Sequence, residues 1–187
     1  MGLRSWVSGL LDDGESGSSA SAADGLALAV DVERRAGSIM ESYDLSGEDA
    51  RQVAEILDAE LTREEGYARS MIADRVSREV AVDEDRARAI VDTEVASIRN
   101  LARVRKFTRQ VGEDVRFRWV DSVGQDDSPV CADVRAAIDE RGPVTLGELE
   151  SIIREAAAEH PDGTPDRADD LVPHERCRHT VVRHVEG

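Results

Sequence analysis

The sequence predicts an α+β protein in which a helical hairpin or bundle is followed by a small Cys/His-clipped cap with a short two-stranded β element. Apolar residues recur at helical spacing through most of 26–111, whereas 115–120 and 180–185 have the patterns of short strands. Both cysteines fall in the last third of the chain, and three of the four histidines lie close in sequence to the second cysteine. A length of 187 residues allows one domain with an appendage. We therefore expect a flexible amino-terminal segment and linker (1–25), a helical domain (26–112) and a small α+β cap (113–187).

The charge of the chain favours an environment of high salt. The 187 residues include 40 acidic and 24 basic side chains, a net charge of −16, and Lys106 is the single lysine. A dense acidic surface repels itself in dilute buffer, and about 1 M salt shortens the Debye length to about 3 Å, which screens that repulsion. The composition thus predicts a salt-adapted, halophilic protein, and the alternative is an ordinary acidic mesophilic protein.

The same charge argues against simple nucleic-acid binding, which depends on a basic surface that releases counterions. No apolar run approaches 18 residues, so no membrane-spanning helix is expected. Residues 1–11 have apolar positions at helical spacing but form too short a segment for a secretion signal. They can dock on a partner or a membrane surface, or pack on their own protein. The Asp-, Gly- and Ser-rich residues 12–25 have the composition of a linker.

Three long helical segments are expected in the first part of the chain, because apolar residues recur every three or four positions and capping residues precede two of the segments. Packed together, they predict an antiparallel helical bundle or hairpin. The segments are 26–43; a second from Ser46 to about residue 80, bent or broken at Gly66; and a third from Asp83 to about residue 111, ended by Gly112.

Glu94 interrupts the apolar face of the third helix, between Val91 and Ile98. Charged side chains are rarely buried without a partner. One interpretation is a boundary carboxylate paired with one of the many arginines. The other is a polar contact that holds the third helix to the Cys/His cap. The sequence leaves both interpretations open.

The expected elements of the cap are shorter. Alternation of Val115, Phe117 and Trp119 with arginines is typical of a half-buried strand. Thr145 and Glu148 form a full capping box at the start of a helix. The other expectations are a loop at 121–129, a short helix at 130–140 beginning near Pro129, a helix from 145 to about 159, an acidic loop reaching Asp170, and a final strand at 180–185 paired with 115–120.

Four residues of the cap are candidate metal ligands: Cys131, His174, Cys177 and His179. Zinc takes about four Cys, His or carboxylate ligands in a tetrahedron, and these residues come from two separate arms of the chain. Asp133 is an alternative oxygen ligand. One structural zinc ion, a Cys131–Cys177 disulfide, and two buried reduced cysteines all agree with the sequence.

No catalytic motif is present: the sequence lacks a nucleophile elbow, a P-loop, a His-Glu-x-x-His helix and a glycine-rich dinucleotide turn. With 40 acidic residues, no carboxylate pair stands out as general acid and base. A hydrolase that uses the cap as a catalytic metal site is disfavoured, because no base or open coordination position can be named. We expect no enzymatic activity, and no cofactor other than a structural zinc.

Between residues 85 and 185 several short motifs follow one another in a distinctive order. A helical Thr-Glu pair is followed by an Asn, a Trp-containing strand, an Asp-rich turn into a Cys, and a Pro-His-x-x-Cys-Arg-His ending. The residues are Thr93, Glu94, Asn100, Trp119, Asp126, Asp127, Cys131, Pro173, His174, Cys177, Arg178 and His179.

This order resembles the head-morphogenesis, or minor head protein, family of tailed viruses, to which the phage Mu minor head protein belongs. In that family the helix carries Arg-Thr-Glu, the turn leads into a Cys pair, and the ending is Pro-x-His-x-x-Cys-Arg-Cys. Here Asp92 replaces the Arg, Val134 stands at the second Cys, and His179 replaces the last Cys. The resemblance gives structural roles to Thr93, Glu94, Asn100, Trp119 and Arg178.

The resemblance implies a structural minor capsid protein of low copy number, associated with the portal inside the virion head, that aids head assembly or genome delivery. It implies a portal protein and other capsid components as partners, oligomerisation through the portal, and residence in the host cytoplasm during assembly. Contact with packaged DNA stays open, and no membrane partner is expected. Together with the composition, it indicates a haloarchaeal virus or provirus. The alternative is a cellular, salt-adapted zinc-binding interaction module.

Overall fold

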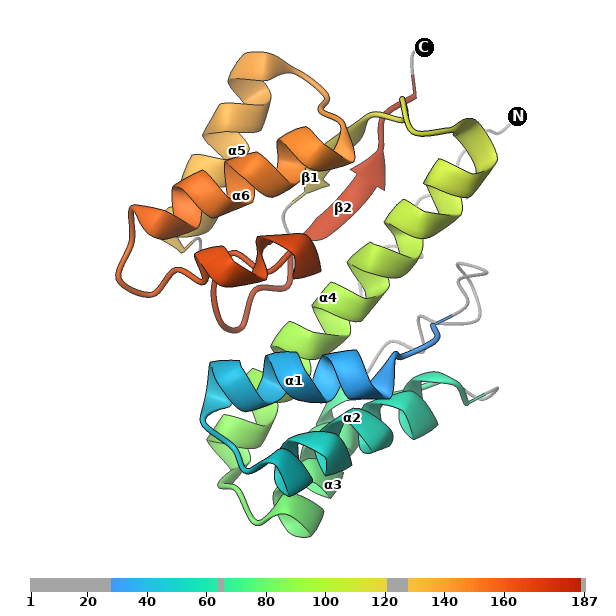
Figure 1. The fold of residues 1–187 in the computed structure, drawn as a ribbon, viewed down its shortest axis with the longest axis vertical. Helices are drawn as coiled ribbons and strands as arrows, with labels where there is room; N and C mark the ends of the chain where they lie inside the picture. Colours follow the sequence, from blue (N-terminus) through green and yellow to red (C-terminus); the bar gives the residue numbers. More distant parts are fainter. Residues whose placement is uncertain (1–27, 64–65, 121–127, 186–187) are drawn as a thin grey trace, which may run out of the picture.

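The computed structural model describes residues 28–63, 66–120 and 128–185. These residues are mainly helical with a small two-stranded antiparallel sheet, so the predicted α+β class is confirmed. One group of elements lies at each end of a long helix (Figure 1). The elements are α1 (Val32–Tyr43), α2 (Gly47–Leu61), α3 (Arg69–Val80), α4 (Glu84–Val111), β1 (Phe117–Val120), α5 (Pro129–Arg141), α6 (Leu146–Ala158), the 3-10 helix η1 (Pro165–Asp170) and β2 (Thr180–Arg183).

Local capping signals fix several helix starts where the sequence predicts them. The side chains of Ser46 and Asp83 accept hydrogen bonds from the third residue after them, which satisfies backbone N–H groups that have no partner within the helix. Thr145 and Glu148 form the reciprocal capping box at α6. The first helix begins at Val32 instead of residue 26, because Asp31 supplies its N-cap.

The segment predicted as one helix with a bend or break near Gly66 is two helices, α2 and α3. The predicted amphipathic segment 1–11, the linker 12–25, and residues 121–127 of the predicted loop lie outside the described residues. Among the described residues, no helix is long and apolar enough to cross a membrane.

The first hydrophobic core lies among α1, α2, α3 and the first half of α4. Helices that follow one another in the chain pack on one another, α1 on α2, α2 on α3 and α3 on α4. The core is aliphatic: Ile39, Leu57, Ile72 and Ile90 are all fully buried. Local connections are therefore sufficient to bring most of this core together.

The second core lies between the sheet, α5, α6 and the end of α4. Strands β1 and β2 pair antiparallel with Phe117 opposite Arg183 and Val120 opposite Thr180, which confirms the predicted pairing. Phe117 also exchanges two backbone hydrogen bonds with Val144, of 2.7 and 3.0 Å. The two cores meet along α4, because Ile98 packs in the first and Val104 in the second.

One expectation for the cap is wrong. The stretch predicted as an acidic loop reaching Asp170 contains η1, and Arg167 and Asp170 at its end are buried. A 3-10 turn of six residues has no apolar periodicity to reveal it in the sequence. Arg167 and Asp170 are buried because they pair with residues of α1 and α4, as described below.

Candidate metal centre and the polar junction beside it

Cys131 enters the site from the first turn of α5. Ser128 is the N-cap and Pro129 occupies the start of the helix, where a missing N–H group costs nothing. This start orients Cys131, with Val130 and Val134, into the second core, and its side chain is fully buried. One arm of the site is therefore held by a regular helix.

His174 comes from the irregular segment that follows η1. It forms an isolated backbone bridge with Gly163, just after α6, and Thr164 fixes the same segment by donating from its N–H to Pro173 O (2.9 Å). A Cβ atom at Gly163 would collide with the backbone carbonyl group of Ala157. A glycine is therefore required for the close approach that positions His174.

Cys177 is placed by a tight turn. Arg176, just before it, has a φ of 60°, in the left-handed region that non-glycine residues rarely adopt. Its backbone N–H donates to Thr93 Oγ1 on α4 at 2.8 Å. This hydrogen bond anchors the turn to the long helix and brings the Cys177 thiol back toward Cys131.

Two contacts hold His179, one to its ring and one to its backbone. Its ring stacks on Trp119 of β1, with centroids 5.4 Å apart and planes 16° from parallel. Its carbonyl oxygen accepts a 3.0 Å hydrogen bond from Asn100 Nδ2, and Asn100 Oδ1 accepts another of 3.0 Å from the N–H of Val181. Asn100 thus satisfies two buried backbone groups and ties the start of β2 to α4.

Three of the four predicted ligands, Cys131, His174 and Cys177, converge in the interior of the cap, and His179 borders this group. The ligand atoms of Cys131, His174 and Cys177 all lie within 4.8 Å of one another, so these three can hold a metal ion. Nδ1 of His179 lies 3.3 Å from the sulfur of Cys131 and 3.6 Å from that of Cys177. All four side chains are buried.

The separation of the two sulfur atoms distinguishes between the alternatives. They are 3.8 Å apart and both thiols are free, whereas a disulfide requires about 2.05 Å. Two thiolates bound tetrahedrally to zinc at about 2.3 Å would be about 3.8 Å apart. The spacing therefore does not fit a covalent bond, whereas it fits both two ligands of one ion and two reduced thiols in contact.

The electrostatics of the cluster favour the thiolate form. The hydrogen bond with Cys131 is the largest cause that lowers the pKa of Cys177 well below its ordinary value, and His174 and His179 add to this against the opposing effect of burial. Burial lowers the pKa of His174, but its contacts with Cys177 outweigh burial and leave that pKa raised. A thiolate is the form of cysteine that binds metal ions.

Two other candidates lie outside the cluster. Asp133, the alternative oxygen ligand, is exposed and 2.8 Å from Nε2 of His160, at the end of α6. His184, which the sequence places near the others, accepts a hydrogen bond from Arg118 at the far end of the sheet. Neither contributes a ligand atom to the group formed by Cys131, His174 and Cys177.

Glu94 is the centre of a buried ion network on α4, next to Thr93, which anchors the turn of the Cys/His cluster. It is fully buried, and its Oε2 lies 2.7 Å from Arg35 Nη1 of α1. Arg167 of η1 approaches both of its oxygens, at 2.7 and 3.1 Å. Both interpretations of Glu94 therefore apply: its carboxylate pairs with arginines, and one of them, Arg167, belongs to the cap.

Asp170 completes the network from the cap side. It lies 2.6 Å from Arg34, 3.1 Å from Arg167 and 3.5 Å from Arg35, and its backbone carbonyl accepts a 2.7 Å bond from Ser97 Oγ. Burial raises the pKa of Asp170, but the three guanidinium groups outweigh it and hold this pKa below its ordinary value.

The sequence interpretation missed Arg35, Ser97, Arg167 and Asp170. Arg167 and Asp170 stand three apart, a spacing that brings them together in a helical turn, but they were assigned to a loop. The one available signal was Glu94 itself, since a buried carboxylate requires buried cations.

The fold and the site define a class: an α+β protein in which a buried Cys/His cluster lies inside a small cap that packs on a helical region. Comparisons of the chain with protein-family models, with curated proteins and with solved structures gave no significant match.

Proposed function

We propose that this chain is a structural minor capsid protein, associated with the portal inside the head of a tailed virus, whose cap is clipped by one structural zinc ion. One observation carries the proposal: three of the motif residues that resemble the head-morphogenesis family, Thr93, Glu94 and Asn100, join α4 to the cap, and a fourth, Trp119, packs inside the cap. Thr93 anchors the turn before Cys177, and Glu94 binds Arg167. Asn100 holds β2, and Trp119 stacks on His179.

A structural role for the zinc is supported by the burial of its proposed ligands. Cys131, His174, Cys177 and His179 are between 0% and 7% exposed. Structural zinc sites use four protein ligands in a closed shell, whereas catalytic sites keep a position open for water. With His179, whose Nδ1 lies 3.3 Å from the sulfur of Cys131, as the fourth ligand, the shell would be closed, and the ion would contribute to folding and not to chemistry.

The proposed setting follows from the resemblance and the charge. The portal protein and other capsid components are the proposed partners, and the oligomeric state is set by the portal. The net charge of −16 suits a haloarchaeal virus or provirus, in which molar salt screens an acidic surface.

Metal analysis tests the zinc clip. Protein purified in high salt without chelator should contain about one equivalent of zinc, and Cys177→Ser or His174→Ala should lower this content strongly. Residues 128–185 of these variants should become protease-sensitive while the helical region stays folded. His184→Ala is the matched control, because His184 lies outside the cluster. Less than about a tenth of an equivalent in the wild type would contradict the clip.

Association with the portal is tested by co-expression. The chain and the portal protein encoded beside it should elute as one complex from size exclusion in molar salt, and the chain should be present in purified virions. Failure to co-elute, together with absence from virions, contradicts the virion role and leaves the zinc clip untouched.

The second candidate is a cellular, salt-adapted zinc-binding interaction module. The buried Cys/His cluster favours it equally, because that cluster carries no viral signature. The gene neighbourhood separates the two: adjacent portal, protease and major capsid genes support the first, and their absence supports the second.

A further inference from the structure

A polar pocket of about 250 Å³ lies where α3, α4 and the segment before β2 meet. Four arginines line it: Arg69 from α3, Arg99 and Arg103 from α4, and Arg178 from the cap. We propose that this pocket binds a small oxyanion of the phosphate class. The inference does not depend on the proposed virion role.

The charge of the lining is opposite to that of the protein. The chain has 40 acidic and 24 basic residues, yet none of the eight described lining residues is acidic and four are arginine. The other lining residues are Ala96, Asn100, His179 and Thr180. Asp92, which pairs with Arg69, is not among these lining residues, and guanidinium groups match the geometry of phosphate oxygens.

Neighbouring groups hold the arginines at the walls of the pocket. Nη1 of Arg99 lies 3.3 Å from the hydroxyl oxygen of Tyr67, and Nη1 of Arg103 lies 3.4 Å from Oδ1 of Asn100. Arg69 donates from Nη1 to the backbone carbonyl of Asp92 at 3.2 Å and to its carboxylate at 3.1 Å. These contacts reduce the rotamer freedom that each side chain loses on binding a ligand.

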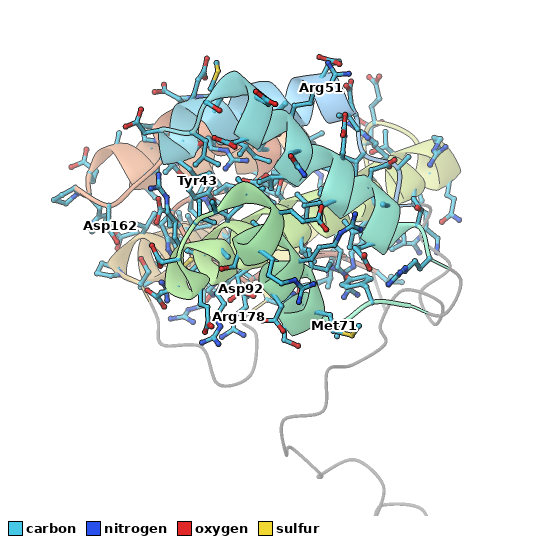
Figure 2. All side chains as sticks on the ribbon, turned by 90° about the horizontal axis from the view of Figure 1, so that it is seen from below. Tyr43, Arg51, Met71, Asp92, Asp162 and Arg178 are labelled. Atoms are coloured by element: carbon cyan, nitrogen blue, oxygen red, sulfur yellow. The ribbon has the colours of Figure 1, made fainter. Side chains whose placement is uncertain are left out.

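The wall formed by the cap is fixed in the same way. Asn100 bonds the backbone of His179 and Val181 on either side of Thr180, so the segment that carries Arg178 is held against α4. Figure 2 shows Arg178 on the same side of the molecule as Asp92, the residue that holds Arg69. The cationic groups therefore reach the pocket from separate parts of the chain and are positioned before a ligand arrives.

The size and surroundings of the pocket favour a small anion over a polymer. A volume of about 250 Å³ holds several water molecules, and so it also holds a tetrahedral anion with part of its hydration. A nucleic acid would bring further phosphates against a chain of net charge −16 and be repelled. Inorganic phosphate or a small phosphate monoester is small enough to contact the pocket alone, so it avoids this repulsion.

Calorimetric titration with inorganic phosphate tests the proposal, using the full chain in KCl at which circular dichroism shows it folded. The wild type should bind phosphate saturably and more weakly as KCl is raised. The double variant Arg103→Gln/Arg178→Gln should lose at least about tenfold in affinity, since it lacks two charge-assisted donors. Arg88→Gln is the matched control, because Arg88 is an exposed arginine of α4 paired with Glu84 outside the pocket, and its affinity should equal that of the wild type.

Absence of saturable binding to the folded wild type, or equal affinity in all three proteins, would overturn the proposal. If the double variant does not fold, Arg178→Lys replaces it: this keeps the charge but removes the forked donor, and it should weaken binding measurably. A short DNA duplex forms the second arm and should not bind under the same conditions. If the wild type binds the duplex and the double variant does not, the pocket still binds phosphate, but the phosphate group is that of a phosphodiester backbone.

Discussion

The helical region and the cap are both built on buried apolar cores, but they are assembled differently. The core of the helical region runs from Leu28 to Ile98, is aliphatic apart from Tyr43 and Tyr67, and forms mostly between successive helices. The core of the cap contains both cysteines and surrounds a polar cluster in which Cys131 lies 43 residues or more before the other members. The helical region therefore depends on local packing, whereas the cap depends on a few specific polar contacts.

The two regions are joined by α4 and by the Glu94 network. Glu94 and Ser97 on α4 bind Arg35 from the helical side and Arg167 and Asp170 from the cap. A buried network of this kind fixes geometry more than it adds net stability, but loss of one member leaves its partners buried and unpaired. The following predictions test this division, from the largest expected effect to the smallest.

Glu94→Ala should have the largest effect. It leaves Arg35 and Arg167 buried without their main counter-charge, which costs about 3–5 kcal/mol of the free energy of unfolding. Urea unfolding at fixed KCl measures this change. Glu84→Ala, which removes an exposed pair with Arg88, should cost less than about 1 kcal/mol. A similar loss in both variants would show that the network does not hold the two regions together.

Matched truncations in the two cores should have the next largest effect. Leu57 of α2 and Leu149 of α6 are both fully buried, so Leu57→Ala and Leu149→Ala should each cost about 2–5 kcal/mol. The two variants should differ in which region of the molecule opens more easily. Amide exchange in Leu149→Ala should accelerate mainly in the cap, and in Leu57→Ala mainly in α1 to α3. Uniform acceleration in both variants would mean that the molecule opens as one unit and has no separable cap.

The same contrast explains what the sequence could predict. Ser46, Asp83 and Thr145 predict where their helices begin, because each N-cap hydrogen bond joins two residues that are only three positions apart. The position of Arg167 depends on Glu94, 73 residues away, and no local pattern contains that information. The short helix η1 was missed for this reason.

The sequence predicts the candidate metal site only in part. Residue type identified Cys131, His174, Cys177 and His179, because few side chains bind zinc and these are concentrated in the cap. Residue type could not exclude Asp133. It sits two residues after Cys131, but on a different face of α5, where it contacts His160.

Asn100→Ala should have a smaller effect that is confined to the junction of the cap with α4. The substitution removes both hydrogen bonds to the start of β2 and leaves two buried backbone groups unpaired, which costs about 1–3 kcal/mol. The amide of Val181 should lose protection from exchange while Ile72 keeps it. Gln110→Ala on the exposed end of α4 is the control and should change neither amide. Unchanged protection at Val181 would show that the β1–β2 pairing alone holds the strand.

The smallest expected effect is a change in how the free energy of unfolding depends on pH in the acidic range. Because the pKa of Asp170 is lower in the folded protein than its ordinary value of 3.8, the unfolded chain binds the proton more readily. The stabilisation from this carboxylate is therefore complete above about pH 3.8 and is lost as the pH falls through the lower folded value. Urea unfolding from about pH 6 to about pH 3 at fixed KCl should show the wild type losing more stability than Asp170→Asn, which has no carboxyl group to protonate. Asp169→Asn, at the exposed neighbouring position, should follow the wild type. If the curve of Asp170→Asn instead parallels that of the wild type across this range, the acid sensitivity comes from other carboxylates, and the junction between the two regions does not titrate.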